Sequence, residues 1–143
     1  MQHFSTLDEA ALQQLGAVRM TADEQPGFPC RVSLQDAAPG EEVLLLPYQH
    51  HSTRSPYQSS GPVYIRREAK TAAPGINEIP FMLQHRLLSL RAYDGNGMMK
   101  NALVIEGNML AATLHQLFEA AAIACVHIHN AKAGCYNCLA ERA

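Results

Sequence analysis

The chain has 143 residues, of which 48% are apolar and 17% charged, so a single domain over residues 1–143 with a hydrophobic core is expected. The formal net charge of −2 argues against nucleic acid as a partner, because no strong positive field is present. The longest apolar stretch, residues 120–126, is far shorter than the roughly 20 residues that cross a bilayer, so we expect no membrane partner. The opening MQHFSTLDEA has no basic segment followed by an apolar one, which predicts a cytoplasmic protein.

The first half of the chain predicts one helix and two strands. Leu7, Leu12 and Leu15 recur at helical spacing over residues 6–15, and Gly16 is expected to end this helix. Residues 42–48 (EVLLLPY) and 62–66 (PVYIR) are typical of short strands. Residues 50–61 (HHSTRSPYQSSG) predict a long loop between them. His50 and His51 at its start are expected to be solvated, although either could still swing in as a ligand.

A β-hairpin is the clearest prediction in the second half. RLLSLRAY and MMKNALVIEG flank Asp94–Gly97 (DGNG), a run of residues that favour tight turns. Alternation along the first strand predicts two opposite faces: Leu88, Leu90 and Ala92 on one, and Ser89, Arg91 and Tyr93 on the other.

An amphipathic helix is predicted after the hairpin, with Asn108 as its cap. Its apolar side would be formed by Met109, Leu110, Thr113, Leu114, Leu117 and Phe118. Residues 122–129 then predict a buried strand, and a last short strand follows a turn at residues 130–134. These elements predict an α+β fold, a mostly antiparallel sheet with an N-terminal helix and one amphipathic helix packed on it.

Residues that could carry chemistry are concentrated in the last predicted hairpin. Alternation places Cys125, His127 and His129 on one face of the strand. If residues 130–134 connect the hairpin, His129 should face Cys135, and Cys138 should point away. His127, His129 and Cys135 could then hold zinc or another transition metal with an open position for water or substrate.

Other chemical interpretations of this segment remain open. Cys135 and Cys138 have the spacing of a zinc knuckle or a redox pair, but that model needs a turn where the first model needs a strand. Cys135 could also be a nucleophile beside His129, with His127 as a further catalytic residue. Alternatively, the histidines and cysteines are hydrogen-bonded core residues without a chemical role.

Two arginines are candidate ligands for an anionic small molecule. Arg91 on the hairpin, and Arg31 next to Cys30, could hold such a ligand by charge-assisted hydrogen bonds, and Asn130 and Cys30 could contribute to the same site. The alternative is that these arginines satisfy local carboxylates, for which Asp36, Glu41 and Glu42 are candidates.

Four segments resemble the bacterial family catalogued as domain of unknown function 1203. They are PGFPCRVSLQDAAPGEEVLLL (26–46), SPYQSSGPVYIR (55–66), RLLSLRAYDGNGMM (86–99) and HIHNAKAGCY (127–136). The resemblance implies no activity, but it places eight residues in characteristic blocks: Cys30, Arg31, Arg91, His127, His129, Asn130, Gly134 and Cys135. Cys125 and Cys138 are not part of that pattern.

Two classes of function are consistent with these observations. The first is a small-molecule-binding protein or enzyme whose pocket contains His127, His129 and Cys135, with or without a metal. The second is a non-catalytic interaction protein, in which a sheet edge or the apolar helix face pairs with a partner or with a second copy in a homodimer. If His129 and Cys135 open into a cavity, the first class is favoured; if they are packed and saturated by protein groups, the second is favoured.

Overall fold

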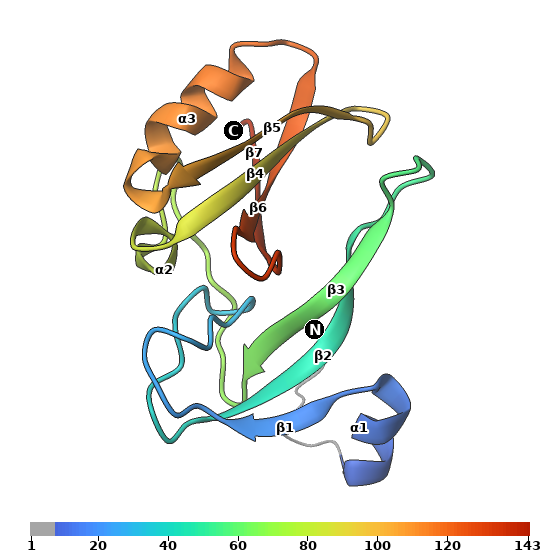
Figure 1. Cartoon of the computed structure of the whole chain (residues 1–143), viewed down its shortest axis with the longest axis vertical. Helices are drawn as coiled ribbons and strands as arrows, with labels where there is room; N and C mark the ends of the chain where they lie inside the picture. The colour runs from blue at the N-terminus through green and yellow to red at the C-terminus, as the bar shows by residue number, and fades with distance from the viewer. Residues whose placement is uncertain (1–7) are drawn as a thin grey trace.

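Two antiparallel sheets form the framework of the protein. The computed structural model describes residues 8–143 and has strand orders β1-β2-β3 and β5-β4-β6-β7. The three-stranded sheet fills the lower half of Figure 1 and the four-stranded sheet the upper half, with β2 and β3 reaching between them. The α+β class and the antiparallel pairing are thus confirmed, and the strands are divided between two sheets.

The three-stranded sheet consists of β1 (Val18–Thr21), β2 (Glu42–His51) and β3 (Ser59–Arg66). It packs with helix α1 (Glu9–Leu15) around a core that includes Leu12, Cys30, Leu44 and Val63. Asp8 caps α1 by accepting a hydrogen bond from the backbone of Ala11, and Gly16 ends it at φ 71°, as its position predicts. The predicted helical residues 6–7 lie outside the described residues.

The two long strands extend further than the sequence predicts. β2 reaches His51 and β3 begins at Ser59, so the connection covers residues 52–58, and the predicted twelve-residue loop is wrong. His51 pairs with Ser59, and both strand ends are stabilised by this ladder despite their polar side chains. His50 and His51 therefore lie in a strand and are not solvated loop residues.

The four-stranded sheet consists of β4 (Leu87–Asp94), β5 (Met99–Glu106), β6 (Ile123–Asn130) and β7 (Tyr136–Glu141). The predicted β4-β5 hairpin is confirmed, with Gly97 at φ 77° in its turn. The carboxylate of Asp94 accepts hydrogen bonds from the backbone of Asn96 and Met98, which fixes the turn.

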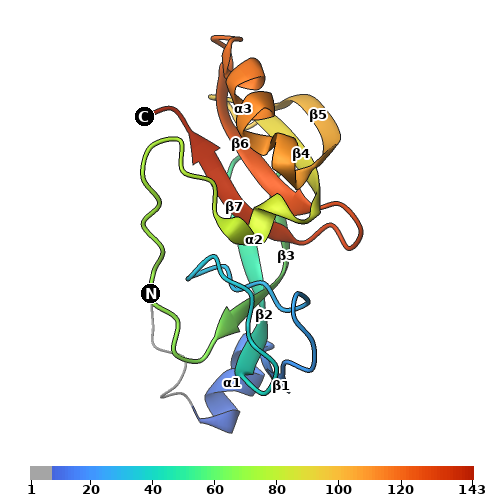
Figure 2. The same cartoon turned by 90° about the vertical axis from the view of Figure 1, so that its left-hand side faces the viewer.

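Helices cover one face of this sheet. Helix α3 (Leu110–Phe118) follows the short 3-10 helix η2 (Gly107–Met109), and α2 (Phe81–Gln84) lies beside them (Figure 2). Their core includes Leu88, Leu90, Ala92, Leu110, Leu117, Val126 and Ile128, which confirms the predicted apolar face of β4. Two details are wrong: Asn108 makes no capping hydrogen bond, and Met109 is 53% exposed, because a 3-10 turn precedes the helix.

The opposite face of the four-stranded sheet lies against the end of β2. The rings of His50 and His51 contact those of His129 and His127 there. No helix in residues 8–143 is both long and apolar enough to cross a membrane. The two sheets thus enclose aromatic and imidazole side chains, and this is where the candidate site lies.

Candidate metal centre

Three histidines from the two sheets converge. His127 and His129 alternate on β6 and share its face, as the sequence predicts, and both are buried. His50 approaches from β2, and its ring centroid lies 4.9 Å from that of His129. One ring nitrogen from each of the three lies within 4.8 Å of the others, a group suited to holding a metal ion.

A β-bulge in β2 aims two consecutive histidines at the same neighbour. Tyr48 pairs with Gly61 and His51 with Ser59, so β2 holds one more residue than β3 over this interval. A bulge of this kind redirects side chains that would otherwise point to opposite faces. His51 accordingly contacts His127, with ring centroids 4.8 Å apart, while His50 contacts His129.

The ring of His129 is held in one tautomer. Its Nδ1 lies 2.8 Å from the carbonyl oxygen of Gly134, which can only accept, so Nδ1 carries the proton. Nε2 therefore has a free lone pair, and this atom is buried without a hydrogen-bond partner among the described residues. Metal-binding histidines are commonly oriented by such a hydrogen bond from the other ring nitrogen to a carbonyl.

His50 and His127 also have ring nitrogens without partners. Nδ1 of each is buried and makes no hydrogen bond within the described part of the chain. Unpaired buried polar atoms are rare because each loses its hydration without compensation. Three such atoms in one cluster of histidines are compatible with metal binding.

All three imidazoles are held in the neutral form. Burial lowers the pKa of His127 and of His129 to about 4, the hydrogen bond to Gly134 acts in the opposite direction on His129, and the charge of Arg91 lowers both further. Burial also lowers the pKa of His50, followed by the charge of Arg91. Neutral imidazole is the form that binds a metal, so these histidines need not lose a proton to do so at neutral pH.

Tyr136 forms a wall of the cluster. It pairs with His129 across β6 and β7, and its ring stacks on that of His50 at 5.3 Å with an interplanar angle of 8°. Arg31 donates hydrogen bonds to the backbone carbonyls of Tyr136 and Pro29. Arg31 thus ties β7 to the loop that precedes β2, and burial lowers its pKa to about 10.

Arg91 lies at the same face. It pairs with His127 in the β4-β6 ladder, and directly opposed residues in an antiparallel pair share a face. Its side chain is half-buried and makes no hydrogen bond or ion pair with another described residue. The predicted alternative, in which a local carboxylate satisfies Arg91, has no support in the described residues.

Cys135 does not face His129, contrary to the sequence-based geometry. The β6-β7 register shifts between Ile128 and His129, so His129 pairs with Tyr136, and His127 pairs with Leu139. Cys135 instead accepts a hydrogen bond at its carbonyl from the backbone of Asn130. The predicted pairing of His129 with Cys135 is therefore wrong, while the role of Cys135 as a ligand or nucleophile stays a sequence-based prediction.

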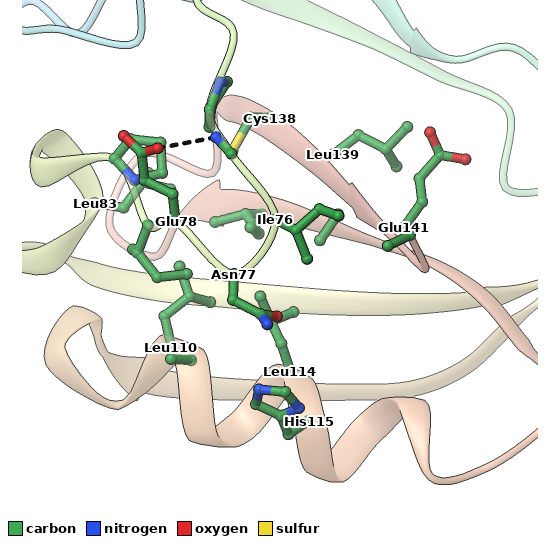
Figure 3. Close-up of a pocket in the computed structure, with 18 of the residues that line it drawn as sticks. Ile76, Asn77, Glu78, Leu83, Leu110, Leu114, His115, Cys138, Leu139 and Glu141 are labelled. Atoms are coloured by element: carbon green, nitrogen blue, oxygen red, sulfur yellow. Dashed lines mark hydrogen bonds between the residues drawn. The ribbon is translucent and has the colours of Figure 1, made fainter.

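The other cysteines lie apart from the histidines. Cys138 pairs with Ile128 and packs on the core side, pointing away from His127 and His129 as predicted. It lines a pocket of about 580 Å³ between α3, β7 and residues 74–80, and Ile76 and Leu114 line the same pocket (Figure 3). All four cysteines are free thiols.

Two predicted ligand-binding residues have structural partners. Cys30 is fully buried, and its sulfur accepts hydrogen bonds from the backbone of Ser33 and Arg66. The side chain of Asn130 accepts a hydrogen bond of 2.7 Å from Asn137. Both therefore stabilise loops next to the cluster.

A family model described as "Protein of unknown function (DUF1203)" matches residues 27–142. The chain belongs to the DUF1203 family. No curated protein and no solved structure shows a significant match to it. The three histidines all lie within the part of the chain that the DUF1203 model matches, and the resemblance expected from sequence is confirmed.

Sequence reasoning missed three residues of this DUF1203 site. The sequence predicts His50 and His51 in a loop, from which either could swing in, and gives Tyr136 no role. The polar run QHH directly continues the strand EVLLLPY, which could have suggested a longer strand. The bulge that turns both histidines inward has no comparable signal in the sequence.

Proposed function

We propose that this DUF1203 protein binds one divalent transition metal ion, zinc in the first instance, through His50, His127 and His129. Two observations support this: one ring nitrogen of each histidine lies within 4.8 Å of the others, and each histidine has a buried ring nitrogen without a partner among the described residues. Three imidazoles suit zinc, copper, iron and nickel. The protein is then a metal-dependent small-molecule-binding protein or enzyme, and not a purely structural one.

The number of ligands favours a reactive over a structural metal. Structural zinc sites use four protein ligands, whereas catalytic sites use three and leave a position for water or substrate. The group has three histidines, and Cys135 does not join it. A metal here would lower the pKa of a bound water and could polarise a substrate oxygen.

The site needs a modest contraction to bind an ion. Nitrogen ligands around one zinc lie about 3.3 Å apart, given bonds of about 2.0–2.1 Å in tetrahedral geometry. His50 is the mobile partner, because it is half-buried, while His129 is fixed by Gly134. Rotation of the His50 side chain would bring its nitrogen toward the other two.

Titration of apo protein with Zn²⁺ and Co²⁺ in a calorimeter tests this proposal, using protein without an affinity tag. We expect one ion per chain, and at least a hundredfold weaker binding for His129→Ala, while circular dichroism verifies folding. His115→Ala is the matched control, because His115 is exposed on α3. Absence of tight binding by the unmodified chain, or equal affinity of both variants, would refute the proposal.

A further inference from the structure

We propose that the open coordination position of this site takes a small carboxylate, which Arg91 holds beside the metal. This inference rests on the proposed metal site and names the class of its ligand. Arg91 would act as a binding residue and not as a metal ligand, because its guanidinium has no lone pair to offer.

Arg91 is the exception among the half-buried arginines of residues 8–143. Arg31 and Arg86 donate to backbone carbonyls, and Arg86 also pairs with Asp36. Arg66 pairs with Glu41, and Arg19 with Glu9 and Glu42. Only Arg91 has no hydrogen bond or ion pair with a described residue. A half-buried guanidinium loses part of its hydration, so an anion that pairs with Arg91 would compensate its charge.

The position of Arg91 connects it to the histidines. It lies directly opposite His127 in the β4-β6 ladder, on the face that carries His129 two residues further along β6. Its charge is among the causes that lower the pKa values of His50, His127 and His129. An anion bound by Arg91 would therefore lie within reach of a metal held by these rings.

Charge around the cluster favours an anionic ligand. Arg91 and Arg31 are the permanently charged groups among the causes that shift the pKa values of the three histidines, and no carboxylate is among those causes. A divalent ion on three neutral imidazoles would add two positive charges to that of Arg91. An anion is then needed to compensate them, because uncompensated charge is costly in a partly buried site.

A carboxylate fits these partners better than a phosphate. A single guanidinium forms two parallel hydrogen bonds with a planar carboxylate, or one while the second oxygen binds a metal. A phosphate carries more charge and is usually held by several donors. The neighbouring rings of Tyr93 and Tyr136 also suit an organic ligand with an apolar part, since both rings contact His127.

The test uses Co²⁺-loaded protein, whose visible absorption reports changes in the metal's ligands. Acetate should give a saturable spectral change, and Arg91→Met should weaken acetate binding at least tenfold. Arg91→Lys keeps the positive charge but loses the paired N–H donors of the guanidinium, so it should give an intermediate loss of acetate affinity. Co²⁺ affinity should stay the same or rise in Arg91→Met, because a repulsive charge is removed. Arg54→Met is the control, since Arg54 is exposed in the loop between β2 and β3.

The outcomes separate the two proposals. If the unmodified chain binds no Co²⁺, the metal site is refuted and the carboxylate site with it. If Co²⁺ binds but acetate has no effect, or has the same effect in Arg91→Met and Arg54→Met, only the carboxylate site is refuted. Tighter binding of inorganic phosphate than of acetate would overturn the assigned ligand class.

Discussion

His50 and His51 are adjacent in the chain, yet both imidazoles face β6 and have different partners. His51 packs on Tyr93 with ring centroids 4.0 Å apart, and its Nε2 donates to the carbonyl of Gly97 at 3.0 Å. His50 makes no such hydrogen bond, and its buried Nδ1 is unpartnered. The bulge in β2 thus gives one histidine a structural role and leaves the other available to a ligand.

This division predicts opposite effects for two neighbouring substitutions. His51→Ala should lower the free energy of unfolding by about 1–3 kcal/mol, because it removes a buried ring and a hydrogen bond. His50→Ala should cost less than about 1 kcal/mol but should abolish tight Zn²⁺ binding. Urea denaturation of apo protein and calorimetric titration measure the two effects. The assignment fails if His51→Ala has the larger effect on metal affinity.

Acid should destabilise the metal-free protein before its carboxylates titrate. The pKa values of folded His127 and His129 are about 4, against about 6.5 in an unfolded chain. Between these values the unfolded state binds more protons, so stability falls as pH falls. We expect a loss of about 2 kcal/mol per histidine between pH 7 and pH 5.

Denaturation in urea with a chelator present measures this pH dependence. His129→Gln should reduce the loss between pH 7 and pH 5, because one buried imidazole is gone. His115→Gln should leave it unchanged, since His115 is exposed. A stability that is flat over this range in the unmodified chain would contradict the burial of neutral histidines.

The cysteines should react with alkylating reagents in an order set by their surroundings. Burial raises the pKa of the Cys138 thiol to about 12, and Cys30 is fully enclosed. Cys135 is partly exposed. Iodoacetamide at pH 8 should label Cys135 at least about tenfold faster than Cys138, as peptide mapping would show. All four should react alike in urea, and faster labelling of Cys138 in the native protein would contradict the placement of β7.

Gly107 should tolerate no side chain. A Cβ there would lie 1.9 Å from the carbonyl oxygen of Leu83, so Gly107→Ala should cost more than about 2 kcal/mol. Gly95 in the β4-β5 turn is the matched control, because a Cβ there would meet nothing within 4 Å. Gly95→Ala should change stability by less than about 0.5 kcal/mol. Equal urea unfolding midpoints for Gly107→Ala and Gly95→Ala would contradict the close contact between Gly107 and the backbone of Leu83.

Local patterns predicted the elements with strong periodicity. DGNG specified the turn of the β4-β5 hairpin, and alternation placed Leu88, Leu90 and Ala92 in the core. Alternation also placed His127 and His129 on one face of β6. These features depend on residues that are close in sequence, and for that reason the sequence alone was sufficient to predict them.

The partners of those histidines depend on tertiary structure. Bulges shift the registers of β2 against β3 and of β6 against β7 by one residue. In β7 the bulge places Tyr136 opposite His129, where the register of the preceding pairs would place Asn137, and in β2 the bulge directs both His50 and His51 inward. The sequence determined which strand carries the paired histidines. Only the packing of one sheet against the other decided which third histidine meets them, because that contact joins residues more than seventy positions apart.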